Sequence, residues 1–150
     1  MKTLVRLTLF SIFAVICSAL VMADNPGRHP HYLHALSDLR HARAQLDKLA
    51  MNEQRDEMEQ RAIEKIDDAI NELKRASIDD GKDLNYHPPI DTHLKRGERY
   101  RKALELLDSA HRDVTMEEDD PRAQGLQGRI IAHIDQAHRI VEKLQARYNH

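Results

Sequence analysis

The chain has 150 residues, and its charges nearly balance: 23 Lys and Arg, 25 Asp and Glu and 10 His give a formal net charge of −2. Acidic and basic residues are interspersed along the sequence, so no basic stripe is present that would neutralise a run of phosphates, and this argues against nucleic-acid binding. The one cysteine, Cys17, has no partner for a disulfide within the chain. Stability must therefore come from packing alone.

The first residues, MKTLVRLTLFSIFAVICSALVMA, have the pattern of a secretory signal peptide. Lys2 and Arg6 form a short positive region, and the apolar run over 7–21 is short for a bilayer span and leads into a cleavage site. We expect cleavage after Ala23 and a periplasmic or secreted protein with no stable membrane anchor. The expected mature chain, 24–150, has 21 basic and 25 acidic residues, a net charge of −4, and no Trp, Phe or Cys. Thiolate metal sites, cysteine nucleophiles and c-type haem are thereby excluded.

The first half of the expected mature chain contains two stretches in which apolar residues recur at intervals of three and four, the pattern of one helical face. The first stripe consists of Tyr32, Ala35, Leu39, Ala42, Leu46 and Leu49, and the second of Ile63, Ile66, Ala69 or Ile70, Leu73 and Ala76. The segment AMNEQRDEMEQ between them holds no Gly or Pro. We place a turn near Asn52; the alternative is one unbroken helix from about 31 to 76, which would leave its stripe uncovered unless the protein dimerises.

The second half repeats this organisation after a proline-containing connection. KDLNYHPPID resists helix because of its two consecutive prolines, which predicts an extended linker over 79–90. Asp91 can cap a third helix, and Asp120 followed by Pro121 is a specific start signal for a fourth. The two stripes consist of Tyr100, Leu104, Leu107, Ala110 or His111, and Val114, and of Ile130, Ile134, Ala137, Val141, Leu144 and Tyr148. No stretch has a period of two, so the mature protein is predicted to be all-α.

The two halves resemble each other. Residues 61–76 align without gaps on residues 129–144, and five of the sixteen positions are identical. Each half also contains a His-Pro pair near its start, at His29-Pro30 and His87-Pro88. Together these similarities favour a duplicated helical hairpin.

Two hairpins, at about 31–78 and 91–148, make four helices whose apolar stripes can be buried together in one domain, 24–150. The predicted fold is an antiparallel four-helix bundle built from two tandem helical hairpins. Its core residues are mainly Ala, Leu and Ile and have little bulk, so a homodimer is the alternative way to complete the core.

Histidines gather at the start of the first predicted helix, with four of the chain's ten inside thirteen positions. His31, His34, Asp38 and His41 have the three-four spacing of one helical face, and His29 could add a ligand from the preceding loop. Imidazole nitrogen with a carboxylate suits Cu(II), Ni(II) or Zn(II). The alternative is a solvated face beside the core in which Asp38 pairs with a histidine.

The motif Asp-x-x-His occurs three times, at Asp38/His41, Asp108/His111 and Asp135/His138. Residues one turn apart on a helix can bind one ion together, or the carboxylate can orient the imidazole. Di-iron carboxylate bundles use Glu-x-x-His aimed inward, and this chain departs from that pattern because its acids are Asp and lie off the apolar stripes. His111 does lie at the same angle as the apolar stripe of its helix, a position more typical of a core histidine.

No motif of an enzyme is found: the chain lacks a phosphate-binding glycine loop, a serine elbow and HExxH. The sequence resembles the small His-rich metal-binding helical bundles of the bacterial periplasm in its export signal, its duplicated hairpins, a mature chain without cysteine, and its helix-borne His. That resemblance implies metal buffering without catalysis, with a divalent metal ion or a periplasmic protein as partner. The alternatives are a structural or protein-interaction module with solvated histidines, a pH sensor, and b-type haem binding through His and Met.

Overall fold

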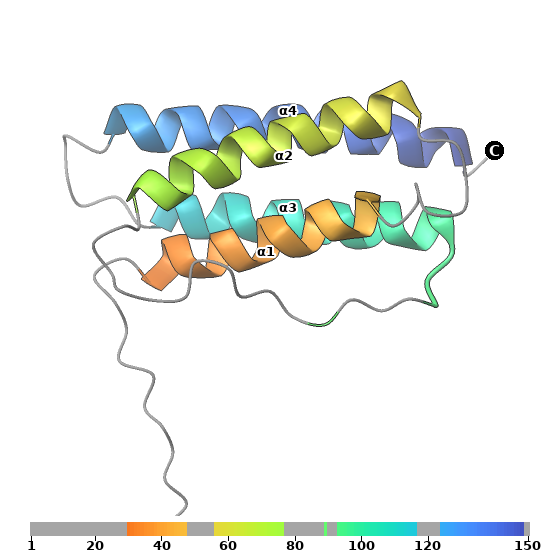
Figure 1. The fold of residues 1–150 in the computed structure, drawn as a ribbon, viewed down its shortest axis with the longest axis horizontal. Helices are drawn as coiled ribbons and strands as arrows, with labels where there is room; N and C mark the ends of the chain where they lie inside the picture. The colour runs from red at the N-terminus through yellow and green to blue at the C-terminus, as the bar shows by residue number, and fades with distance from the viewer. Residues whose placement is uncertain (1–29, 48–55, 77–88, 90–92, 117–123, 149–150) are drawn as a thin grey trace, which may run out of the picture.

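A computed structural model describes residues 30–47, 56–76, 89, 93–116 and 124–148. The regular structure of these residues is entirely helical, so the all-α prediction is confirmed. The helices are α1 (Pro30–Asp47), α2 (Glu57–Ala76), α3 (Arg96–Met116) and α4 (Gln124–Tyr148). They form the predicted antiparallel four-helix bundle (Figure 1). None of these helices is both long enough and apolar enough to cross a membrane.

Each helix packs mainly on two neighbours. Helix α1 contacts α2 and α3, and α4 contacts the same two helices, so α2 and α3 lie on one diagonal of the bundle. Neighbouring helices are antiparallel, whereas α2 and α3 run in the same direction (Figure 1). The 19 residues between Ala76 and Arg96 therefore join opposite ends of the bundle. A 20-residue helix is about 30 Å long, and 19 residues can extend about twice as far, so the connection is long enough.

The predicted apolar stripes form the core. Every stripe residue whose exposure is described is buried, with three exceptions. Leu104 and His111, the alternative to Ala110, are partly buried, and Tyr148 is 49% exposed at the end of α4. The structure also buries residues that the stripes omit, which widens the buried face of α1, α2 and α3. These are the apolar residues Leu36, Ala62, Ala103 and Leu106 and the polar residues Gln45 and Glu59. A core-facing helix needs a face at least about 100° wide, so a minimal stripe understates burial.

The first hairpin consists of two separate helices, which excludes the single rod. Helix α1 ends at Asp47, and Asp56 caps α2: its Oδ1 accepts a hydrogen bond from the backbone N–H of Met58 at 2.8 Å. Glu59 Oε2 in turn accepts one from the N–H of Asp56 at 3.0 Å, which completes a reciprocal capping box. The turn predicted near Asn52 lies outside the described residues.

Helix α3 begins later than predicted. It starts at Arg96, not after Asp91, because the N–H of Lys95 donates to Glu98 Oε2 at 2.9 Å and residues 93–95 are not helical. This is half of a capping box: Lys95 stands where Ser, Thr, Asp or Asn is usual, and its side chain has no acceptor for the reciprocal hydrogen bond. Asp91, most of the 79–90 linker and the Asp120-Pro121 start signal lie outside the described residues.

The internal similarity extends over both helices of each hairpin. The offset of 68 that aligns residues 61–76 on 129–144 also aligns α1 on α3. Five α1–α3 positions are then identical and face the core: Tyr32/Tyr100, Ala35/Ala103, Leu36/Leu104, Leu39/Leu107 and Ala42/Ala110. One register therefore relates the two hairpins throughout. The two His-Pro pairs are 58 residues apart, so they do not occupy corresponding positions.

Candidate functional site

The histidine stripe of α1 does not come together as one site. His31 Nδ1 lies 3.4 Å from Asp113 Oδ1 of α3, and its side chain is 41% exposed. His41 Nε2 lies 3.2 Å from the side-chain nitrogen of Gln45. These two histidines thus face different neighbours, although the three-four spacing puts them on one side of the helix.

The rest of that stripe adds no third ligand. His34 is exposed and Asp38 is partly buried, while His29 lies outside the described residues. Within the described ranges, no three His, Cys, Asp or Glu side chains lie close enough together to hold one metal ion as they stand. A metal site on α1 therefore stays a prediction, because the described residues of α1 do not gather around one position for an ion.

The other predicted residues meet between α3 and α4. His111 Nε2 lies 3.5 Å from Asp135 Oδ1, and His138 Nε2 lies 3.1 Å from Asp108 Oδ1. Because the helices are antiparallel, the Asp of each Asp-x-x-His motif faces the His of the other. We call these four residues, Asp108, His111, Asp135 and His138, the quartet.

The quartet surrounds a hollow in the surface. The hollow has a volume of about 240 Å³ and is lined by the quartet together with Leu107 and Ile134. The two apolar residues belong to the buried core, whereas the side chains of His111 and His138 are 40% and 25% exposed. His111 is thus at the margin of the core and not inside it, and a small solute can reach all four polar side chains.

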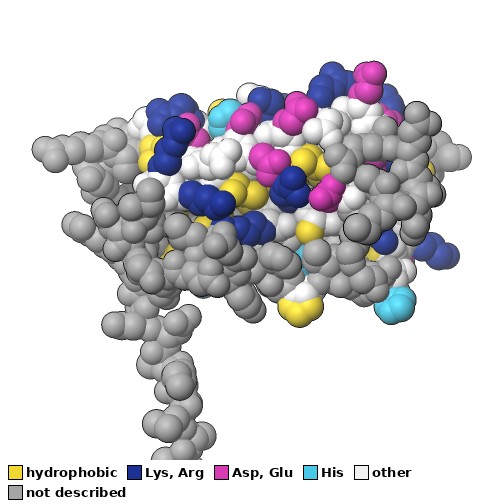
Figure 2. Space-filling model, in the orientation of Figure 1, with side chains coloured by type: hydrophobic (Ala, Val, Ile, Leu, Met, Phe, Trp, Pro, Cys, Tyr) yellow, Lys and Arg dark blue, Asp and Glu magenta, His cyan; other side chains and the backbone are white. Residues whose placement is uncertain are grey.

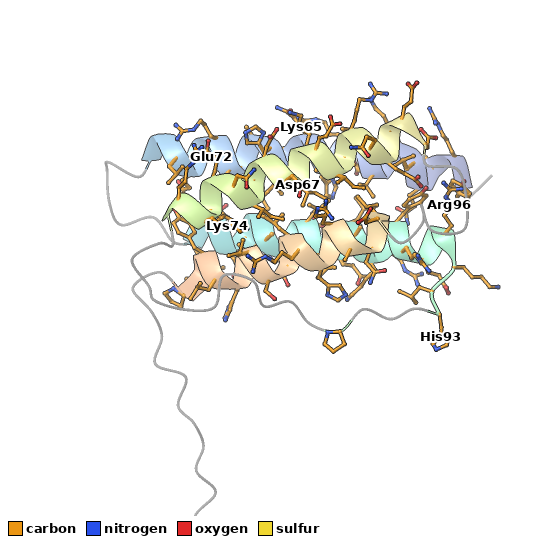
Figure 3. The ribbon with its side chains drawn as sticks, viewed as in Figure 1. Lys65, Asp67, Glu72, Lys74, His93 and Arg96 are labelled. Carbon is orange, nitrogen blue, oxygen red and sulfur yellow. The ribbon has the colours of Figure 1, made fainter. Side chains whose placement is uncertain are left out.

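The first hairpin shows what corresponds to the quartet. At the offset of 68 its positions are Arg40, Arg43, Asp67 and Ile70. Arg43 Nε donates to Asp67 Oδ1 at 2.6 Å, and this hydrogen bond raises the pKa of Arg43 above its ordinary value. Asp67 lies on α2 (Figure 3). The equivalent interhelical contact is therefore an Arg–Asp ion pair in the first hairpin and a His–Asp pair in the second.

A further His–carboxylate pair, which sequence reasoning missed, joins α2 to α4. His133 Nδ1 lies 3.6 Å from Asp68 Oδ2, and the same carboxylate oxygen accepts a hydrogen bond from Lys65 Nζ at 2.9 Å. Lys65 would compete with a cation for this carboxylate, and only one imidazole is present. This pair is a weaker candidate for a metal site than the quartet.

A buried charged network lies at the end of the bundle where α2 and α3 begin and α4 ends. Glu59 is fully buried, and its Oε1 accepts hydrogen bonds from the Tyr100 hydroxyl and from Arg96 Nη2, the latter at 2.8 Å. Arg96, which is labelled in Figure 3, stacks 5.0 Å above the ring of Tyr148, and that ring meets Tyr100 edge-on at 5.4 Å. The ring contacts and the shared carboxylate tie three helices together, so this network is structural.

The network predicts a loss of stability at alkaline pH. Burial raises the pKa of Tyr100 above its ordinary value, the hydrogen bond to Glu59 raises it further, and Arg96 opposes the rise. Because the folded-state pKa is the higher one, this contribution to stability is present below the unfolded-state pKa of about 10 and is lost as the pH rises above it. We expect the urea midpoint to fall more between pH 9 and 11 in the wild type than in Tyr100→Phe. Equal falls would show that Tyr100 does not resist ionisation.

The described surface offers no apolar docking patch. The large exposed hydrophobic residues are Met116 and Tyr148, at the end of α3 and at the end of α4. On the face shown in Figure 2, Lys and Arg side chains are interspersed with Asp and Glu, as the sequence predicts. The described surface therefore offers the hollow lined by the quartet, with its two imidazoles and two carboxylates, as a site for a small ligand.

Comparison of this chain with protein-family models, with curated proteins and with solved structures finds no match. The chemistry must therefore be inferred from the site itself and from the difference between the two hairpins.

Proposed function

We propose that this protein is a non-enzymatic, exported metal-binding protein that holds one divalent transition metal ion in the quartet. The observation that carries the proposal is the meeting of two Asp-x-x-His motifs, from α3 and α4, around one solvent-accessible hollow. Two imidazoles and two carboxylates without thiolate suit Zn(II), Cu(II) or Ni(II).

The distances within the quartet fit shared ligands. Zinc ligands lie about 2.0–2.1 Å from the ion, which puts two tetrahedral ligand atoms about 3.4 Å apart. The two His–Asp pairs are separated by 3.5 Å and 3.1 Å, close to that spacing. Each pair thus supplies two ligands. Closing the four-ligand site requires the two pairs to rotate towards each other, and the hollow between them gives room for that movement.

The comparison of the hairpins also supports the proposal. At positions 40, 43 and 70 the first hairpin has Arg, Arg and Ile, none of which can bind a metal cation. Its Arg43–Asp67 pair shows that the fold does not need histidine at this interface. A role in stability alone therefore does not explain why the second hairpin has four potential ligands there.

The proposal is tested by calorimetric titration of the untagged protein with Zn(II), Cu(II) and Ni(II). We expect one ion per chain and at least about tenfold weaker Zn(II) binding in His138→Ala, because a ligand is lost. The matched control is His34→Ala, which removes an exposed α1 histidine and should leave the affinity unchanged. Loss of binding in His34→Ala alone would move the site to the α1 stripe. Absence of any binding would leave the histidines as structural partners, in an interaction or structural module.

A further inference from the structure

The imidazole of His138 lies between two carboxylates. Its Nε2 is 3.1 Å from Asp108 on α3, and its Nδ1 is 3.6 Å from Glu142 Oε2, one turn further along α4. Glu142 does not line the hollow, whereas His138 and Asp108 do. The ring therefore presents Nε2 to the hollow and Nδ1 to Glu142.

This arrangement matches what metal-bound histidines require. A ligating imidazole binds the ion through one nitrogen and donates the other N–H to a carboxylate or carbonyl, which fixes the ring and raises its basicity. His111 has no such support within the described part of the chain, where its one side-chain ion pair is the one that Nε2 makes with Asp135. The two histidines of the quartet are thus unequal.

The first hairpin again provides an internal comparison. At the offset of 68, His138 corresponds to Ile70 and Glu142 to Lys74, which is on α2 (Figure 3). The first hairpin thus lacks the imidazole, and in place of the neighbouring carboxylate it has a positively charged lysine. Histidine and glutamate therefore occur together, in the hairpin that has the quartet.

We propose that Glu142 is a positioning residue for metal binding: it holds the Nδ1 side of His138 so that Nε2 points into the hollow as a preorganised ligand. This inference rests on the proposed metal site. The Glu142 side chain is 56% exposed, so it can move the short way from 3.6 Å to a hydrogen bond with the Nδ1–H. It would contribute affinity without contacting the ion itself.

The test is Zn(II) titration of Glu142→Ala, Glu142→Gln and the control Glu105→Ala. Glu105 is on α3, pairs with Lys102 at 3.3 Å and is 56% exposed, as is Glu142. Replacing either glutamate by alanine removes one negative charge, so the two variants have the same net charge. We expect about tenfold weaker binding in Glu142→Ala, a typical effect for such a partner. Glu142→Gln should recover most of the affinity, because its amide oxygen still accepts the Nδ1–H, and Glu105→Ala should bind like the wild type.

The outcomes separate this inference from the function on which it rests. If the wild type binds Zn(II) and Glu142→Ala binds equally well, the role of Glu142 is overturned while the metal site stands. Equal weakening in Glu142→Ala and Glu105→Ala would also overturn it, because the effect would then be that of net charge alone. If the wild type binds no Zn(II), the metal site itself fails, and the role of Glu142 fails with it. Thermal unfolding of the metal-free variants should be unchanged, since Glu142 is on the surface.

Discussion

Glu59→Ala is expected to lower the free energy of unfolding by about 3–5 kcal/mol, the range found when one partner of a buried ion pair is removed. Glu59 is fully buried, and the side chain of its partner Arg96 is only 18% exposed. Truncation would leave the guanidinium in a poorly solvated place without its carboxylate. It would also leave the Tyr100 hydroxyl without its acceptor and remove half of the α2 capping box.

The measurement is urea-induced unfolding at pH 7 followed by circular dichroism, with two reference variants. Glu59→Gln keeps an acceptor oxygen but removes the charge, so its loss should be smaller than that of Glu59→Ala. Glu64→Ala, an exposed site on the same helix, should change the stability by no more than about 0.5 kcal/mol. If Glu59→Ala fell as little as Glu64→Ala, the network would contribute nothing to the stability of the bundle.

Sequence reasoning could not have found this network. Glutamate is almost never fully buried unless it is paired, and Glu59 takes part in a capping box that by itself would leave it at the surface. Its burial depends on Arg96 and Tyr100, which are 37 and 41 residues further along the chain. Which side chains meet at the end of a bundle is decided by the order of the helices in space, and helical periodicity does not contain that order.

The fold, in contrast, could be predicted from the sequence. Periodicity alone identifies Leu39, Leu107 and Ile134 as core residues, and all three are buried. The ends of the helices were predicted less accurately. The start of α3 depends on a hydrogen bond from the N–H of Lys95 to the Glu98 side chain, and these two residue types do not by themselves predict a helix start.

The sequence identified the individual residues of the quartet, but not that they lie together in the structure. The two later Asp-x-x-His motifs read alike along the chain, and only antiparallel packing reveals that Asp108 faces His138 and that His111 faces Asp135. The expectation that consecutive helices pack antiparallel could have suggested this crossing. On α1 the same spacing brings no such group together, because α3 packs against that side of the bundle and His31 lies next to Asp113.

His111→Arg is expected to lower the Zn(II) affinity by at least about 100-fold, more than the loss of a supporting residue would cost, while leaving the bundle folded. An arginine has no lone pair to offer and remains protonated. At this position it reproduces the first hairpin, in which Arg43 holds Asp67 at 2.6 Å, so it should also draw Asp135 away from the ion. Two ligands are then lost through one substitution.

The comparison that makes this result specific is His34→Arg. That variant adds the same charge at an exposed position of α1, and we expect it to bind Zn(II) like the wild type. Circular dichroism of His111→Arg should show full helicity and an unfolding midpoint at or above that of the metal-free wild type, because the Arg–Asp pair is already compatible with this interface. Undiminished Zn(II) binding by the folded His111→Arg protein would remove the quartet as the site. A bundle that failed to fold would instead contradict the equivalence of the two hairpins on which the assignment depends.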